Sequence, residues 1–340
     1  MKKNAERKAK SGKKAMSIWV LYAILIASIA AYIFYNNVLI GVFAFVVLVL
    51  AIVLDVKTSV ETGGIQGAFK EIAMAVGAVV LVWIILIAVL GTSSPVDVVV
   101  SCSMLPTLQR GDLVVVHGIS NLSSFAEENH VPVVNMTQSQ FSAMQAGMYS
   151  EFLAYYAYYP SNRSDISETI SQSVSGYSIG LYNTKCISGY LFEGQYNRVA
   201  GCMVSSQSGN PIKYSYSIGN VTINGQVYNE VYTSGISILN TTVSQNYSNP
   251  IIIYKTTSSD SFSGDIIHRL YAVIRVGGDY YTLTKGDNNP YLDIEAANYP
   301  ANQSSIVGYE VARVPYVGYL RLILTGQVGQ VPGCNMQLQR

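Results

Sequence analysis

The stretch LYAVIRVGGDYYTLTK, residues 270–285, holds two runs of β-branched and aromatic residues on either side of Gly277-Gly278. Two such runs joined by two turn-forming residues are typical of an antiparallel β-hairpin. When the register of this hairpin is carried outward, His268 falls opposite Asp287. Directly paired residues have Cβ atoms about 5 Å apart, so the hairpin predicts contact between an imidazole and a carboxylate. Gly286 is the point at which this register can slip.

Residues that suit nucleophilic chemistry gather in three strings of the chain. The strings are SCSMLPTL at 101–108, GDIIHRL at 264–270 and TKGDNNPYLD at 284–293. A serine becomes a nucleophile when a histidine accepts its proton and a carboxylate orients that histidine. The hairpin register places His268 and Asp287 together, and a base beside a carboxylate is what activation of a serine requires.

The strings resemble the boxes of type I signal peptidases, in the archaeal and endoplasmic-reticulum branch of that serine protease family. A fourth string of the family follows in the expected order, VPYVG at 314–318. The resemblance implies that Ser103 is the nucleophile and that His268 is the base, where bacterial relatives use a lysine. It makes Asp293 the partner of His268 and Asp287 a second essential or supporting carboxylate, whereas the hairpin register favours Asp287. It also implies an oxyanion hole formed by Ser101 and the backbone N–H of Ser103.

Several of these residues have an alternative role. Lys255 and Lys285 are rival bases, but neither stands at the family's basic position, and a lysine base must be buried to lose its proton. A salt bridge to Arg269 or Lys285 is the alternative role of Asp287. Cys102 has the alternative role of nucleophile in a cysteine protease, but it stands beside the family's nucleophile position, in a slot that usually holds glycine. The three histidines are far apart and no Cys-x-x-Cys pair occurs, so we expect neither a metal nor a cofactor.

Hydrophobic runs before these strings indicate a membrane anchor. Residues 16–91 contain three uncharged runs, at about 18–35, 38–54 and 72–90. Helices of about 17–25 apolar residues are long enough to cross a bilayer. The tail before them, residues 1–15, has seven Lys/Arg and one Glu, and such basic tails stay in the cytoplasm. The chain is therefore expected to be a multi-pass protein of the cell membrane with residues 92–340 on the outer face.

Composition narrows the class of protein further. Charged residues make up 12% of the chain, against about 25% in soluble domains, which argues against an ordinary cytosolic enzyme. The net charge is +1 and the basic excess sits in the tail, so we expect no nucleic-acid partner. Hydrophobic residues reach 50%, which excludes disorder for most of the chain.

The part outside the membrane is expected to be mainly β. Its predicted parts are an antiparallel, barrel-like catalytic domain at 92–117 and 250–340 and a polar β-rich lobe inserted at 118–249. Within the lobe we expect a hairpin around Asn224-Gly225 and a helix at about 138–159. All four cysteines lie beyond residue 91, and Cys186 and Cys202 of the lobe are a candidate disulfide pair.

The resemblance implies a membrane-bound serine endopeptidase that removes N-terminal signal peptides from exported proteins. Its partners would be signal-peptide-bearing preproteins and the lipid bilayer, and the protein-export machinery is a candidate partner. The alternative is a non-catalytic, glycosylated surface or binding protein built on the same scaffold. Seven Asn-x-Ser/Thr sequons, all beyond residue 91, are the feature that suits this alternative.

Overall fold

The computed structural model describes residues 19–145 and 177–339, apart from gaps at 33–34, 36–37, 193–194, 208–210, 224–225, 258–263, 297, 328, 330, 332–333 and 335–336. The chain divides into two compact units. The first is Met1–Val89 with Val314–Val317, and the second is Leu90–Arg313 with Gly318–Arg340. All of the candidate catalytic residues belong to the second unit.

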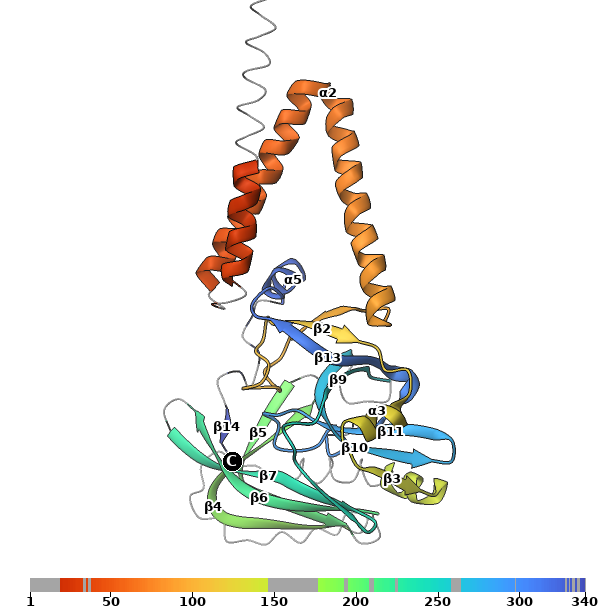
Figure 1. Ribbon diagram of the computed structural model, residues 1–340. Coiled ribbons are helices and arrows are strands. Elements are labelled where there is room, and N and C mark those ends of the chain that lie inside the picture. Colours follow the sequence, from red (N-terminus) through yellow and green to blue (C-terminus); the bar gives the residue numbers. More distant parts are fainter. Residues whose placement is uncertain are drawn as a thin grey trace, which may run out of the picture. The chain divides into compact units, whose positions relative to one another are not determined.

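The first unit contains long apolar helices (Figure 1). Helix α2 runs from Val38 to Leu90 and is interrupted at Gly64, whose φ of 63° lies in the left-handed region that glycine adopts readily. Leu39–Thr58 and Gly64–Leu90 are each long and apolar enough to cross a membrane; they cover the predicted run 38–54 except for its first residue, and all of the run 72–90.

The first predicted run, 18–35, coincides with a shorter apolar helix, Trp19–Tyr32. Many large apolar side chains on all these helices are exposed, among them Leu81 and Trp83. A helix that is apolar around its whole circumference needs an apolar environment, which a bilayer supplies. The helices are therefore compatible with membrane association.

The second unit is built on an open sheet whose strands are paired in the order β1-β2-β13-β9-β10-β11-β12, with β3 pairing with β10. The strands are β1 Val96–Val98, β2 Leu113–His117, β3 Val133–Met136, β9 Ile251–Lys255, β10 Asp265–Val276, β11 Asp279–Lys285, β12 Ala301–Asn302 and β13 Ile306–Val314. The predicted hairpin is β10–β11, with Val276 opposite Asp279. Among the described strands this sheet ends at β1 and β12, so the expected barrel-like closure is not observed.

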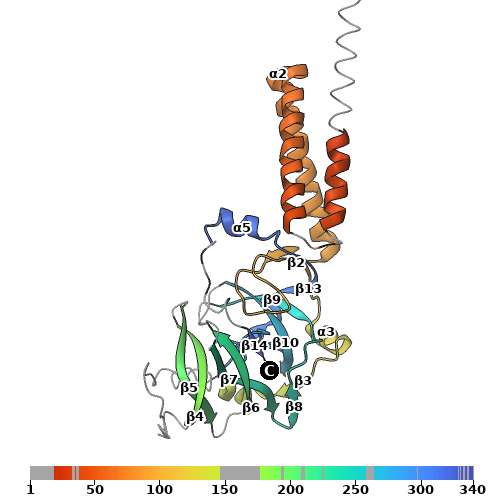
Figure 2. The same ribbon diagram turned by 90° about the vertical axis from the view of Figure 1, so that its left-hand side faces the viewer.

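A second sheet accounts for most of the predicted lobe (Figure 2). Its strands are β4 Tyr177–Phe192, β5 Gln195–Gln207, β6 Ile212–Ile223, β7 Gln226–Ile238, β8 Thr241–Ser244 and β14 Leu338–Gln339. Ile223 pairs with Gln226, which confirms the expected hairpin strands. Of the predicted helix at 138–159, residues 138–145 are helical and the rest lie outside the described residues.

The lobe does not begin where the sequence suggested. Helix α3, Leu122–Glu128, contributes Leu122 and Phe125 to a core cluster of the first sheet, and β3 pairs in parallel with β10. Residues before 137 therefore belong to the first sheet and not to a separate lobe. The physical reason is that β10 is buried along nearly its whole length, which requires packing on both of its faces.

The two sheets share one hydrophobic core. Ile236 and Ile238 of β7 lie in the same cluster as Ile274 of β10 and Leu292 of the acidic string. The backbone N–H of Thr233 donates to the carbonyl of Pro290 at 2.7 Å, and the Thr233 hydroxyl donates to the Glu295 carboxylate at 2.8 Å. The inserted strands thus support the segment that carries the candidate acidic residues.

Candidate active site

Ser103 lies in the loop that joins β1 to β2. Met104 and Leu108, each 1% exposed, fix this loop to a cluster that includes Val114 of β2 and Ile251 of β9. The N–H of Gly111 donates to the carbonyl of Val99 at 2.8 Å, which closes the base of the loop. Burial of two large side chains next to a partly exposed serine positions the serine hydroxyl at the surface of the sheet.

The three predicted catalytic residues meet in this structure. The Ser103 Oγ lies 2.9 Å from Nε2 of His268, and Nδ1 of His268 lies 2.7 and 2.8 Å from the two carboxylate oxygens of Asp293. His268 is 7% and Asp293 5% exposed. With Nδ1 occupied by a hydrogen bond to the carboxylate, Nε2 is the nitrogen that can accept the serine proton.

Two buried hydroxyl groups hold the Asp293 carboxylate in place. Tyr254 of β9 donates to Oδ2 at 3.0 Å, and Thr284 of β11 donates to the same oxygen at 2.5 Å. A buried carboxylate is costly unless hydrogen bonds compensate it, and these donors fix its orientation toward His268. Sequence reasoning had not assigned a role to either residue, although Thr284 is the first residue of the acidic string at 284–293.

Asp287 forms a salt bridge with Arg269, which is one of the two salt bridges proposed as its alternative role. The Arg269 guanidinium donates to the two Asp287 carboxylate oxygens at 2.7 Å each, and the Thr107 hydroxyl donates to one of them at 2.6 Å. Arg269 also donates to the carbonyl of Asn249 at 2.5 Å. This network connects the serine loop, through Thr107, to β10, so Asp287 positions the loop, whereas the carboxylate bonded to the imidazole is that of Asp293.

The hairpin register that set His268 opposite Asp287 is wrong near the end of the strands. Arg269 pairs with Lys285, but the register shifts between Leu270 and Ala272. One additional residue on β10 therefore forms a β-bulge. The residues of β10 that precede it, His268 among them, are displaced by one position relative to β11. Bulges of this kind recur beside active sites, where they redirect a side chain, and here the redirected side chain is His268.

Breaking the Arg269–Asp287 pair should destabilise the protein. Both side chains are less than 10% exposed, so replacing Asp287 by alanine leaves an uncompensated buried guanidinium. We expect the free energy of unfolding to fall by about 3–5 kcal/mol, measured by denaturant titration. Asp279→Ala, at the exposed hairpin turn, is the matched control and should change it by less than about 0.5 kcal/mol. Equal stability of the two variants would contradict a structural role for Asp287.

Ser101 lies beside the nucleophile. Its hydroxyl is 3.1 Å from the hydroxyl of Ser103. At this distance the two hydroxyl groups form a hydrogen bond, which keeps the Ser101 side chain on the same side of the loop as the attacking oxygen. The oxyanion role of Ser101 stays a prediction, because it requires donation to a substrate oxygen.

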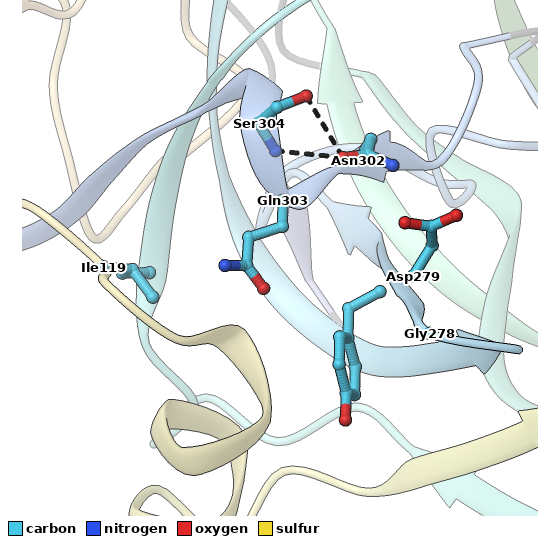
Figure 3. A pocket seen from close by; sticks show the side chains of 7 residues that line it. Ile119, Gly278, Asp279, Asn302, Gln303 and Ser304 are labelled. Atoms are coloured by element: carbon cyan, nitrogen blue, oxygen red, sulfur yellow. Dashed lines mark hydrogen bonds between the residues drawn. The ribbon is translucent and has the colours of Figure 1, made fainter.

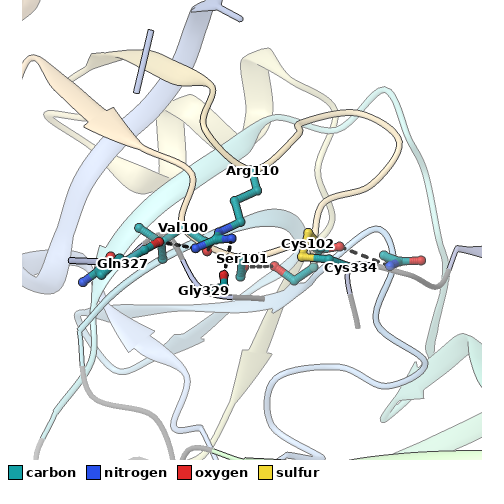
Figure 4. Close-up of a disulfide and its surroundings, with 9 residues drawn as sticks. Val100, Ser101, Cys102, Arg110, Gln327, Gly329 and Cys334 are labelled. Atoms are coloured by element: carbon teal, nitrogen blue, oxygen red, sulfur yellow. Dashed lines mark hydrogen bonds between the residues drawn. A yellow bond between two sulfur atoms is a disulfide. The ribbon is translucent and has the colours of Figure 1, made fainter. Parts of the chain in front are cut away.

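The rival residues have other surroundings. Lys255 is exposed at the end of β9 and pairs with Asp265 across the strands. Lys285 is fully buried, and its Nζ donates to the carbonyl of Asn289 at 2.5 Å. Cys102 forms a disulfide with Cys334, so its sulfur is not a free thiolate (Figure 4). Cys186 and Cys202 lie on β4 and β5, but their side chains are outside the described residues, and their pairing stays a prediction.

A surface hollow of about 350 Å³ lies away from these residues (Figure 3). It is formed by the β10–β11 turn and the short helix η1, Gln303–Ser305. Asn302 caps this helix by accepting the N–H and the hydroxyl of Ser304. Among the described residues, no group of three or more His, Cys, Asp or Glu side chains could hold a metal ion.

Glu310 on β13 introduces a pH dependence of stability. Burial raises the pKa of its carboxyl above the ordinary value of about 4.5, and Arg313 and Arg269 oppose that shift only in part. The folded state therefore binds more protons than the unfolded state, and stability falls as pH rises through the interval above the ordinary value. Glu310→Gln should raise the melting temperature slightly at pH 7 and leave it unchanged below about pH 4, where the wild-type carboxyl is neutral as well. The same dependence of melting temperature on pH in the two proteins would contradict the raised pKa of Glu310.

Comparison with known proteins gives a partial match. Over 64 residues, 18% of this chain, the sequence is 41% identical to the signal peptidase complex catalytic subunit SEC11 of Chaetomium globosum. The matched stretch spans 37% of the length of that relative. No family model matches the chain, and no solved structure matches it. The match therefore supports a relationship to the signal peptidases that extends over less than a fifth of the chain.

Proposed function

We propose that this protein is a membrane-bound serine endopeptidase that removes N-terminal signal peptides from exported proteins. The observation that carries the proposal is the continuous contact from Ser103 through His268 to Asp293, at 2.9 and 2.7 Å. The residues come from three separate strings, and the fold brings them together in the order that nucleophilic catalysis requires. The partial similarity to SEC11 points to the same chemistry.

In the proposed mechanism the Ser103 hydroxyl attacks the scissile carbonyl while Nε2 of His268 takes its proton. Asp293 stabilises the imidazolium that forms, and its hydrogen bonds to Tyr254 and Thr284 keep it from rotating. His268 then gives the proton to the leaving amine, and an acyl-enzyme ester on Ser103 remains. Water hydrolyses this ester by the same proton transfers in reverse, which frees the serine.

An extended peptide is the substrate shape that this sheet suits. Strand β1 is an end strand among the described strands of the first sheet, and the chain continues from it directly into the Ser103 loop. Peptides bind to such edges as an added strand, through backbone hydrogen bonds. A peptide lying along β1 would present its backbone carbonyls near Ser103. By resemblance, small side chains before the cleavage site would be preferred.

The test is processing of a model preprotein by the full-length protein in liposomes. The expected result is cleavage at one site after the signal peptide, read by mass spectrometry of both products. A preprotein with a bulky residue immediately before the cut is the matched control substrate and should resist cleavage. Failure of the folded protein to process any preprotein would favour the non-catalytic alternative.

Topology is a separate part of the proposal. The candidate membrane helices and the Cys102–Cys334 disulfide support an outer location for residues 92–340, because disulfides persist in oxidising compartments. Protease added to intact right-side-out vesicles should degrade this part and spare an epitope attached to the basic tail. Protection of residues 92–340 until the vesicles are opened would reverse the proposed orientation.

A further inference from the structure

The C-terminal part of the chain is attached to the nucleophile loop by a covalent bond. Cys102, between Ser101 and Ser103, forms a disulfide with Cys334, 232 positions later in the sequence (Figure 4). Cys102 is 7% exposed. The bond therefore lies within the serine loop, at the residue next to the nucleophile. The residue that usually fills this slot in the resembled family is glycine, which cannot make such a bond.

Asn288 makes a second connection between the same parts. Its side-chain Nδ2 donates to the carbonyl of Cys102 at 3.1 Å, and its backbone N–H donates to the carbonyl of Ser103 at 2.7 Å. Its Oδ1 accepts the N–H of Leu338 at 2.8 Å. One asparagine thus holds two consecutive carbonyls of the nucleophile loop and the strand β14 in which Leu338 lies.

These bonds fix the direction of one particular peptide unit. The carbonyl of Cys102 and the N–H of Ser103 belong to the same planar peptide, and in a trans peptide the two groups point in opposite directions. Because the carbonyl of Cys102 faces Asn288, the N–H of Ser103 faces away from it. This N–H is the backbone donor expected to stabilise the oxyanion, and its contribution depends strongly on direction.

Arg110 adds a third attachment on the other side of Ser101. Its Nε donates to the carbonyl of Val100 at 3.0 Å, and its guanidinium also donates to the carbonyls of Gln327 and Gly329. The C-terminal segment therefore contacts the loop at Arg110 and at Cys102, and it contacts Asn288 through Leu338.

We propose that Asn288 and the Cys102–Cys334 disulfide are positioning elements for the oxyanion-binding N–H of Ser103, so that the rate of catalysis depends on the oxidised state of this disulfide. The inference rests on the proposed peptidase function. Reduction by a dithiol such as dithiothreitol breaks the S–S bond and leaves two thiols, while the reagent gives up two electrons and two protons and becomes a cyclic disulfide. The C-terminal segment is then held to the loop by hydrogen bonds alone.

The experiment compares kcat and KM for preprotein cleavage in the full-length protein. Asn288→Ala should lower kcat by about 100-fold with little change in KM, because the substrate still binds but the oxyanion loses an aligned donor. Cys334→Ser should lower kcat about 10-fold and make it insensitive to dithiothreitol. Wild-type protein in dithiothreitol should fall to the level of Cys334→Ser. Asn302→Ala, which removes the asparagine that caps η1 outside the nucleophile loop, is the matched control and should keep the wild-type kcat.

The outcomes separate this inference from the proposed function. If the wild-type protein cleaves preprotein and Ser103→Ala does not, but Asn288→Ala and Cys334→Ser retain the wild-type kcat, the positioning role is wrong and the peptidase function stands. Non-reducing peptide mapping that finds Cys102 and Cys334 as free thiols in active protein would also overturn it. If Asn288→Ala does not fold, the reductant and Cys334→Ser measurements decide the question. Absence of cleavage by the wild type would instead count against the proposed function itself.

Discussion

Ser103→Ala should lower kcat for preprotein cleavage by about a million-fold, the size of effect known when a Ser-His-Asp enzyme loses its serine. The alanine has no oxygen to attack the scissile carbonyl, and His268 then has no proton to accept. Binding should persist, because the edge of β1 and the sheet around it are unchanged. The measurement is single-turnover cleavage followed by mass spectrometry, together with substrate binding to the inactive variant.

The control for this prediction is another serine of the same unit. Ser304→Ala removes an exposed hydroxyl at η1 and should leave kcat unchanged. Both variants should melt close to the wild-type temperature, because neither substitution removes a side chain that packs in the hydrophobic core. Substantial cleavage by folded Ser103→Ala would exclude Ser103 as the nucleophile and direct attention to Ser101, 3.1 Å away.

The base gives the second large effect. His268→Ala should lower kcat by at least about 10⁴-fold, because nothing then removes the serine proton. His268→Lys should not restore activity, although a lysine is the base in bacterial members of the family that the sequence resembles. A lysine accepts a proton only when an apolar site makes its ammonium form unfavourable, and the Asp293 carboxylate that faces this position would stabilise the ammonium. The hairpin register had set Asp287 opposite this position, whereas the carboxylate hydrogen-bonded to His268 in the structure is that of Asp293, with the same consequence.

A matched histidine variant distinguishes loss of the base from a general effect of replacing a histidine. His130→Lys, at an exposed position outside the site, should keep the wild-type kcat. Near-native activity of His268→Lys at neutral pH would contradict a histidine base.

Local patterns in the sequence were sufficient to predict the parts of the site but not all of their partners. The β10–β11 hairpin followed from its glycine pair, and Ser103, His268 and Asp293 came from strings that the family resemblance joined. The register near His268 was missed, because a β-bulge depends on packing of both faces of β10 and leaves no mark in the alternation of residues. Strand propensity alone cannot reveal that β10 contains one residue more than its partner strand β11 at this point.

Long-range pairings were the other part that the sequence could not supply. The parallel contact of β3 with β10 joins segments more than a hundred residues apart, and short apolar runs carry no information on their partners. Four cysteines allow three pairings into two disulfides, and spacing alone favoured Cys186 with Cys202. The structure adds Cys102 with Cys334, which depends on where the end of the chain returns to the sheet.

The core that the two sheets share has a consequence for how this chain can change over evolutionary time. An insertion that remains a separate appendage can be lost again in a descendant, because the host fold is complete without it. Here Ile236 and Ile238 of the inserted strands cover Ile274 of the strand that carries His268. Deleting those strands would expose that apolar face and remove the support of Thr233 for the segment after Asp287. Loss of the inserted strands would therefore destabilise the strand that carries His268, so the loops of the lobe can vary but the lobe as a whole cannot be removed from a folded protein.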